Sequence, residues 1–257
     1  MLARVVDVVS GLFDEGSPHR PDLGTGRRAL LPHPPRLGAV IRGFAAQWWH
    51  HRLQWFDGWV SVDAWFAQPE HPLGTAILLP GRMGGMSMPL LHWSAALLTQ
   101  LGWSVLGVTW DEERLSREGA VAHVRCCVEN AFDQAPVGRP VLVVAKSLGT
   151  LALPWAVQHG LPGAWLTPLL QDAAVVAAVQ EAQQRTLLVG GTSDPHWRSP
   201  ASVGPGVVLL ELPDADHGLQ QPGDWRRSLL RQVEIFDQVS RLAEDVLQSA
   251  GRSASSS

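Results

Sequence analysis

The chain has 257 residues, of which 46% are hydrophobic and 17% are charged, and its formal net charge is −4 at pH 7. This composition supports a substantial core and excludes a globally disordered chain, and the length favours one large domain. Because the net charge is negative and no basic run occurs, we expect no nucleic-acid partner. No stretch approaches 18 uninterrupted apolar residues, so we expect no membrane span.

The two cysteines, at positions 126 and 127, are adjacent. Neighbouring cysteines rarely bridge each other, and no spacing typical of zinc ligands is present. We therefore expect reduced cysteines, no metal or other cofactor, and a cytoplasmic protein. Residues 1–13 are apolar enough to suggest a signal peptide, but Asp7 interrupts them and no small-residue cleavage site follows. Arginine supplies nearly all the basic residues, a bias typical of a GC-rich bacterial genome.

The first 48 residues are interpreted as an irregular preface, because prolines occur at 18, 21, 32, 34 and 35, although 36–49 has helical spacing. The segment 52–69 is then predicted to be a hairpin, because alternating apolar residues flank the turn signal Asp57-Gly58. We assign the preface to residues 1–48, the main domain to 49–249 and a disordered polar tail to 250–257.

From residue 75 onward, apolar runs alternate with helical patterns. Such runs predict strands buried on both faces of a mostly parallel sheet, with helices on both sides and the hairpin at an antiparallel edge. We expect about eight strands in this α/β fold. After the hairpin, the predicted strands are 75–80, 104–110, 140–145, 163–170, 186–191 and 206–213, and the predicted helices are 88–101, 111–132, 148–159, 171–184 and 222–248.

The stretch "VLVVAKSLGT" (141–150) places Ser147 between a predicted strand and a predicted helix. Small residues at 145 and 149 would permit a sharp turn there, because the turn brings these two positions close together. Ser147 would then sit on a strained turn, with its hydroxyl exposed at the positive end of the following helix. Ser147 is the candidate nucleophile.

Two further candidates follow later strands. Asp194 lies in "TSDPHW" after the strand 186–191, and His217 lies in "DADHGL" after the strand 206–213. Because function gathers at the carboxyl ends of parallel strands, we expect both side chains near Ser147. Asp214 and Asp216 are the rival acids, but they are so close to His217 in sequence that we interpret them as turn formers. His196 is the rival histidine, and we interpret it as a pocket-wall or surface residue.

The elbow around Ser147 and the order Ser147, Asp194, His217 resemble the α/β-hydrolase superfamily over residues 50–248. The motifs "LLPGRMGGMSMPLLH", "AKSLGT", "GGTSDPHW" and "DADHGL" look most like small bacterial dienelactone-hydrolase-like proteins. The resemblance implies that the backbone N–H groups of Leu148 and of Arg82 or Met83 form an oxyanion hole. The departures are Ala145, where the elbow usually starts with glycine, and Pro80, where the oxyanion loop usually has histidine.

No cap domain is expected, because the segment 171–185 between two predicted strands has room for one helix only. The site should therefore be shallow and open unless residues 1–48 cover it. Met86 and Met88 beside the oxyanion loop are candidate substrate contacts, since flexible thioethers suit an adaptable acyl pocket, although loop packing would explain them equally well. Trp197, three residues after Asp194, is the third candidate for such a contact.

The leading functional hypothesis is a serine hydrolase that cleaves a small-to-medium carboxylic ester or thioester through Ser147, His217 and Asp194. The partner would be a small acyl substrate, and the pattern does not predict an oligomeric state. Two alternatives stay open: a lyase or cyclase that uses the same residues, and a non-catalytic scaffold or ligand binder. Lys146, the sole lysine, is interpreted as a compact charge that ties a neighbouring loop carboxylate or carbonyl to the elbow.

Overall fold

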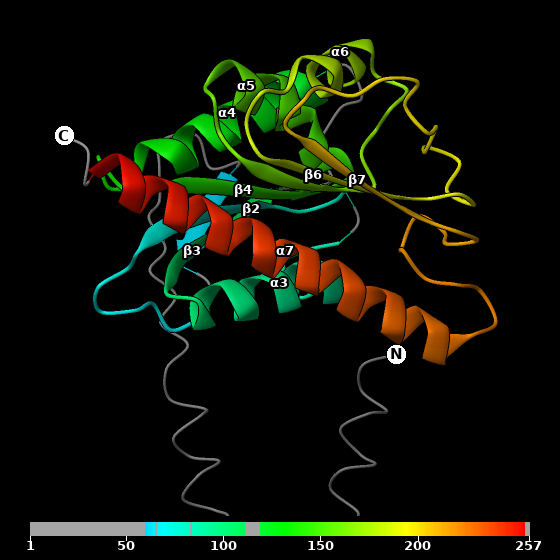
Figure 1. Ribbon diagram of the computed structural model, residues 1–257, viewed down its shortest axis with the longest axis horizontal. Coiled ribbons are helices and arrows are strands. Elements are labelled where there is room, and N and C mark those ends of the chain that lie inside the picture. Colours follow the sequence, from blue (N-terminus) through cyan, green and yellow to red (C-terminus); the bar gives the residue numbers. More distant parts are fainter. Residues whose placement is uncertain (1–59, 65, 83, 111–118, 255–257) are drawn as a thin grey trace, which may run out of the picture. The chain divides into compact units, whose positions relative to one another are not determined.

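The computed structural model describes residues 60–64, 66–82, 84–110 and 119–254 (Figure 1). Its centre is a seven-stranded sheet in the order β1-β3-β2-β4-β5-β6-β7. Six strands are parallel, and β1 pairs antiparallel with β3 at one edge. The strands are β1 (Val60–Ala64), β2 (Gly74–Leu79), β3 (Trp103–Trp110), β4 (Val141–Lys146), β5 (Gly163–Leu166), β6 (Thr186–Gly191) and β7 (Val207–Leu212).

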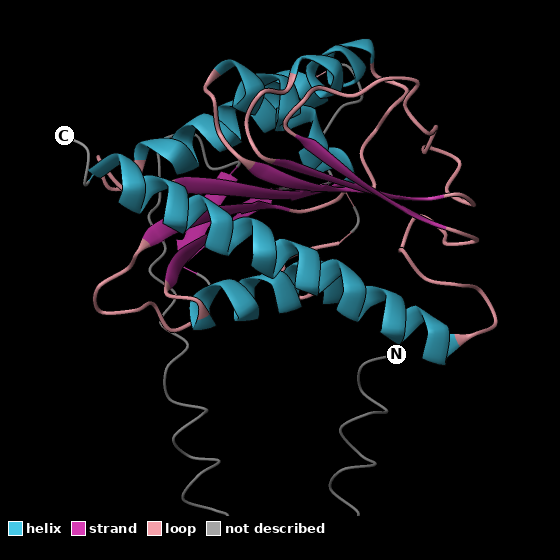
Figure 2. Cartoon of the chain, in the orientation of Figure 1, coloured by secondary structure: helices cyan, strands magenta, loops and turns pink. Residues whose placement is uncertain are grey.

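Helices cover both faces of this sheet, as Figure 2 shows. The helices α4, α5 and α6 lie on one face, and α3 and α7 lie on the other (Figure 1). A 3₁₀ segment, η2, leads from β4 directly into α5. The helices are α3 (Pro89–Gln100), α4 (Ala120–Asp133), η2 (Ser147–Ala152), α5 (Leu153–Gln158), α6 (Ala173–Glu181) and α7 (Trp225–Ala254).

The sheet separates two apolar cores because successive strand residues point to opposite faces. In β2, Ile77 and Leu79 pack with α4 and α5, whereas Ala76 and Leu78 pack with α3 and α7. All six residues of β2 and of β6 are buried. Their near-continuous apolar sequence therefore reflects burial on both faces, and this is why these strands could be predicted from the sequence.

The observed elements agree with the predicted fold class, an α/β sheet with helices on both faces. Seven strands are present in the described part, and the first arm of the predicted hairpin, with the turn at 57–58, lies outside it. The preface 1–48 lies outside it as well. One helix, α6, connects β5 to β6, and no cap domain interrupts the described residues. The closing helix differs, since α7 begins at Trp225 and continues to Ala254, beyond the predicted end at 248.

The two cysteines on α4 have different surroundings. Cys127 is buried in the core, and burial raises the pKa of its thiol to about 12, whereas Cys126 is exposed. Both are free. Cys127 therefore packs in the core, whereas Cys126 lies at the surface. Within 60–254, apart from the short undescribed gaps, no helix combines the length and the apolar character that crossing a bilayer requires.

Gly149 shows why the turn after β4 needs a small residue. A Cβ at Gly149 would lie 2.5 Å from the carbonyl oxygen of Leu79, on the neighbouring strand β2. The sequence correctly marks position 149 as restricted, but the close neighbour is Leu79 rather than Ala145. A hydrogen bond of 3.1 Å from the Gly149 N–H to the Pro80 carbonyl, just after β2, stabilises this close contact between η2 and β2.

We expect Gly149→Ala to lower the free energy of unfolding by about 1–3 kcal/mol, because the added methyl must displace backbone rather than a flexible side chain. Gly85→Ala is the matched control, since a Cβ at Gly85 meets no atom within 4 Å. Urea denaturation of both variants measures the difference. A Gly149→Ala variant as stable as Gly85→Ala would show that the contact with β2 is not restrictive.

Candidate active site

Ser147 lies where β4 ends and η2 begins, at the carboxyl edge of the sheet. Its φ angle is 50°, a left-handed backbone conformation that residues other than glycine rarely adopt. The Thr150 hydroxyl donates to the Ser147 carbonyl, and the same hydroxyl accepts a hydrogen bond of 3.2 Å from the Leu169 N–H. The turn is therefore held in a strained conformation by neighbours on both sides, and its serine is half-buried.

His217 connects Ser147 to Asp194. Its Nε2 lies 2.8 Å from the Ser147 Oγ, and its Nδ1 lies 2.7 Å from the Asp194 Oδ2. Asp194 follows β6 and His217 follows β7, so three strand ends supply one hydrogen-bonded row. With Nδ1 protonated and bonded to the carboxylate, Nε2 is free to accept the serine proton.

The Asp194 carboxylate is almost entirely buried, with 3% of the residue exposed. Burial raises the pKa of this carboxyl, but the hydrogen bonds from His217 and from the His196 backbone N–H, with the charges of both histidines, outweigh it and lower the pKa. The contact with the His196 N–H measures 2.9 Å and uses Oδ1, which leaves Oδ2 for His217. Both carboxylate oxygens therefore have partners, as a buried charge requires.

The rival residues lie nearby but in other roles. Asp216 folds back on its own loop, where its Oδ1 accepts from the Gly218 and Gln220 N–H groups at 2.8 and 3.0 Å. Asp214 has a φ of 59° in the turn after β7. Both are turn formers, as interpreted from the sequence. The His196 ring lies 5.1 Å from the His217 ring in an edge-to-face arrangement, so His196 lines the site without joining the row.

Two backbone segments lie beside Ser147, the first turn of η2 and the loop after β2. Leu148 lies in the first turn of η2, where an N–H has no intrahelical acceptor. Gly81 lies against the serine, since a Cβ placed on it would be 3.4 Å from the Ser147 Cβ. Arg82 follows Gly81 and is exposed, whereas Met83 lies outside the described residues.

The three candidate substrate contacts have different surroundings. Trp197 is buried against Gly190, and its Nε1 donates to the Glu211 Oε2 at 2.8 Å, which joins the loop after β6 to β7. Met86 is buried in the core, where it packs against Gly107. Met88 alone is exposed, just before α3. The structure thus assigns Trp197 and Met86 to packing and leaves Met88 with a solvent-facing side chain.

No known family model matches the sequence, and no curated protein matches it. Solved structures do match. Est1E from Butyrivibrio proteoclasticus, in a structure with ferulic acid bound, has a TM-score of 0.55 at 13% identity, covering 72% of this chain and 96% of its own. Dienelactone hydrolase from Anabaena variabilis has a TM-score of 0.51 at 14% identity, covering 77% and 97%. The domain has the α/β-hydrolase fold.

Proline iminopeptidase from Mycobacterium smegmatis is similar to the chain to the same degree, with a TM-score of 0.54 at 13% identity over 78% of this chain and 99% of its own. The names of these three proteins point to different substrates. The α/β-hydrolase fold therefore determines where the strands end, and the reaction depends on the individual side chains at those ends. Among the residues that the structure describes, no group of three or more potential metal-ligating side chains occurs.

Lys146 joins three strand ends of this α/β-hydrolase fold. Its Nζ donates to the carbonyl of His217 at 3.2 Å and to the Thr167 Oγ1 at 3.4 Å. The predicted tie is therefore to a loop carbonyl, and that carbonyl belongs to His217 itself. Burial lowers the pKa of Lys146, and the charges of Asp194 and Asp216 offset this in part. Lys146 therefore holds the loop that carries His217 against the elbow, and its positive charge opposes the negative charges of Asp194 and Asp216.

We expect Asp194 to make stability depend on pH. Its pKa is lower folded than unfolded, so its contribution is complete above the ordinary aspartate pKa of about 3.9 and is lost as the pH falls through the lowered pKa. Wild type should therefore lose stability relative to Asp194→Asn as the pH falls below about 4 and through the lowered pKa, measured by urea denaturation. Asp237→Asn, on the exposed side of α7, gives the baseline. A constant difference between wild type and Asp194→Asn would contradict the assignment.

We expect Lys146→Met to loosen the loop that carries His217, because the carbonyl loses its charged donor. Hydrogen exchange of the amides at 216–220 should quicken about tenfold, the effect of losing one charge-assisted hydrogen bond. Arg139→Met is the control, since it removes a cation just before the opposite end of β4. Unchanged exchange in Lys146→Met would mean that the loop is held by its own turns.

Proposed function

We propose that the protein is a serine hydrolase that cleaves a small-to-medium carboxylic ester or thioester. The observation that carries the proposal is the row of hydrogen bonds from the Ser147 Oγ through His217 to Asp194, at 2.8 and 2.7 Å. The strained φ of Ser147 adds support, because such strain at a strand-to-helix turn exposes a nucleophile.

The first half of the reaction forms an acyl-enzyme. His217 takes the proton of Ser147 as the Oγ attacks the substrate carbonyl, and Asp194 keeps the imidazole in the required tautomer and stabilises its charge. The tetrahedral intermediate then collapses, and His217 gives the proton to the leaving alcohol or thiol. In the second half, water attacks the acyl-enzyme through the same steps. The chain supplies nucleophile, base and acid, so this mechanism requires no metal or cofactor.

The developing oxyanion requires N–H donors that are already in position. We assign the first to Leu148 and the second to Arg82 or Met83. Removing one such donor from an acyl-transfer site costs about 3 kcal/mol of transition-state stabilisation. The hydrogen bond from Gly149 to the Pro80 carbonyl supports this assignment, because it ties the loop after β2 to the elbow.

The substrate range follows from what surrounds the row. His217 keeps about a third of its side chain exposed, and one helix alone connects β5 to β6. Within the described residues, no inserted domain covers the strand ends on that connection. Such a site favours a substrate whose carbonyl can be reached directly from solvent.

We expect a fluorophosphonate probe to label wild type and not Ser147→Ala, since the probe reacts with an activated serine. Ser199→Ala, which removes an exposed serine in the loop after Trp197, should be labelled like wild type. In parallel, kcat for a chromogenic acetate ester should fall at least a thousandfold in Ser147→Ala.

Two outcomes would contradict the proposal. Absence of labelling in wild type would remove Ser147 as an activated nucleophile and favour a non-catalytic ligand binder. A labelled protein that turns over neither esters nor acyl thioesters would favour lyase or cyclase chemistry at the same residues.

A further inference from the structure

The beginning of α7 carries large apolar side chains on its solvent-facing side. Trp225, Leu229, Leu230 and Val233 are 63, 54, 70 and 55% exposed. On α3, which packs against α7 in the same core, Trp93 is exposed as well. Scattered single apolar residues on a surface need no explanation, but these four fall within three turns of one helix. Together they form an apolar patch of the kind that marks an interaction surface.

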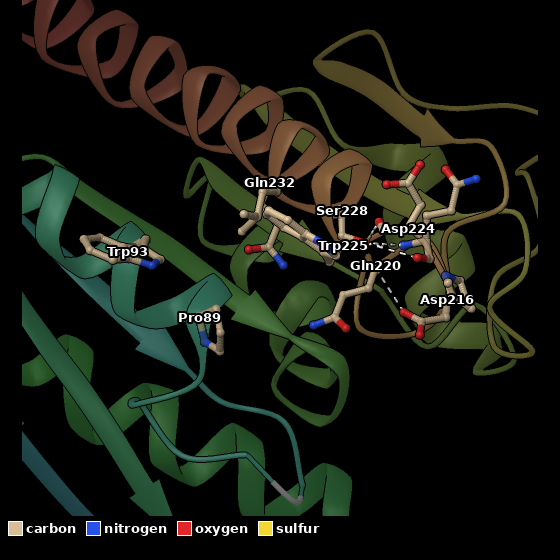
Figure 3. A pocket seen from close by; sticks show the side chains of 12 residues that line it. Pro89, Trp93, Asp216, Gln220, Asp224, Trp225, Ser228 and Gln232 are labelled. Atoms are coloured by element: carbon tan, nitrogen blue, oxygen red, sulfur yellow. Dashed lines mark hydrogen bonds between the residues drawn. The ribbon is translucent and has the colours of Figure 1, made fainter. Parts of the chain in front are cut away.

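A cavity of about 710 Å³ lies between the beginnings of α3 and α7 and continues this patch. Figure 3 shows Trp93 on the α3 side of the cavity and Trp225 on the α7 side. Leu229 lines it too, so the patch extends from α3 across the cavity onto α7. No residue of the hydrogen-bonded row at the strand ends lines this cavity. The patch is therefore a surface distinct from the candidate active site.

Four residues of α7 form a seam on the solvent-facing side of the helix. Arg226, Leu230, Val233 and Asp237 are all exposed. Their spacing of four, three and four residues places them in one line along the helix, as in the seam of a coiled coil. The opposite side of α7 packs into the core, for example through Ile235. The seam therefore faces solvent over about three turns of helix.

The two ends of the seam carry opposite charges. The Arg226 guanidinium lies 4.3 Å from the centre of the Trp225 ring, and this contact restrains the arginine at the surface. Asp237 lies at the other end. Neither Arg226 nor Asp237 forms an ion pair with any residue that the structure describes. The seam thus presents a cation and an anion on either side of an apolar centre.

A second copy of the chain fits this seam when the two α7 helices run antiparallel. A twofold axis between residues 231 and 232 would bring Leu230 of each copy against Val233 of the other. Residues 226 and 237 are equally distant from that axis along the helix, so each Arg226 would lie opposite an Asp237 of the other copy. A parallel pair would instead bring like charges together at both ends. The seam is therefore self-complementary in the antiparallel orientation.

We propose that the protein forms a twofold-symmetric dimer through this seam, in which two Arg226–Asp237 pairs flank an apolar centre of Leu230 and Val233. Trp225 and Leu229 border the seam and enlarge the apolar contact. A membrane surface is less suited, because the seam contains a carboxylate and the chain carries a net charge of −4, which anionic lipids repel. The inference goes beyond the proposed function and does not rest on it, since no residue of the candidate active site takes part.

The size of the seam indicates how strong the dimer is. Standard interfaces bury about 800 Å² on each partner, and smaller interfaces belong to weak or transient complexes. Two helices that pair over residues 226–237 touch along only about 18 Å. We therefore expect a monomer at about 1 µM and mostly dimer at about 100 µM. Unfolding measured at the lower concentration reports on the monomer.

Sedimentation equilibrium of the full chain between about 1 and 100 µM tests the proposal. We expect Arg226→Asp and Asp237→Arg each to weaken dimerisation about tenfold, because each turns two attractions per dimer into two repulsions. The double variant exchanges the two partners and should restore dimerisation. Leu230→Gln should weaken dimerisation about tenfold as well, since it removes the apolar centre of the contact.

Two variants on the other face of the sheet are the matched controls. Glu181→Arg reverses an exposed acid at the end of α6, as Asp237→Arg does on α7. Val121→Gln replaces an exposed apolar residue of α4 and matches Leu230→Gln. Both controls should dimerise like wild type. Every substituted side chain is exposed, so a change in dimerisation is not a consequence of a disrupted core.

Three results would overturn the proposal. The first is a full chain that remains a monomer at about 100 µM. The second is a dimer that neither charge reversal weakens, or that the double variant does not restore, because the contact would then lie elsewhere. The third is a monomer that binds vesicles of phosphatidylcholine and phosphatidylglycerol and loses this binding in Leu230→Gln, which would assign the patch to a membrane.

Discussion

The close approach between η2 and β2 is the constraint on which the candidate site depends. Gly149 lies against the Leu79 carbonyl, and no side chain fits between them. This contact lets the chain leave β4 through a left-handed Ser147 and enter η2 without drifting away from the sheet. The serine hydroxyl then stands at the carboxyl edge, where the later strands also deliver their loops. A wider turn would place the same serine out of reach of His217.

The charges around His217 are balanced across several strand ends. Asp194 is a buried carboxylate bonded to the imidazole, and Asp216 holds the loop in shape just before the histidine. Lys146, the last residue of β4, donates to the His217 carbonyl. Its charge opposes both acids, and its hydrogen bonds use backbone and hydroxyl acceptors rather than the carboxylates themselves. The Asp194 carboxylate therefore keeps its hydrogen bonds to the His217 ring and to the His196 backbone N–H.

The sequence is sufficient to predict most of the sheet and the three residues in the hydrogen-bonded row. β6 matches its predicted bounds, because its residues are apolar and buried on both faces, which leaves a continuous signal. Ser147, Asp194 and His217 could be singled out because each follows a strand, and parallel strands end at one edge. These predictions depend on local patterns, on the direction of the strands and on the resemblance of the motifs to the α/β-hydrolase superfamily.

Features that depend on which way a loop residue points could not be predicted. Trp197 follows Asp194 closely, but its ring turns inward onto Gly190 and its N–H reaches Glu211. Met86 likewise turns into the core, whereas Met88, two residues on, is exposed. His196 contributes its backbone N–H to Asp194, a role that carries no side-chain signature. Spacing in a sequence gives the distance between residues along the chain. Only packing decides to which side of a loop each side chain points.

The cavity between the beginnings of α3 and α7 shows the same limit on a larger scale. Its walls come from α3 and from the β7–α7 region, which lie more than a hundred residues apart. The shared fold constrains the strand ends, as the likeness to proteins with unrelated names illustrates. It does not constrain exposed side chains such as Trp93 and Trp225, which can change without cost to the core. A chain with the α/β-hydrolase fold can therefore keep the same strand ends while the exposed residues at the ends of two helices differ.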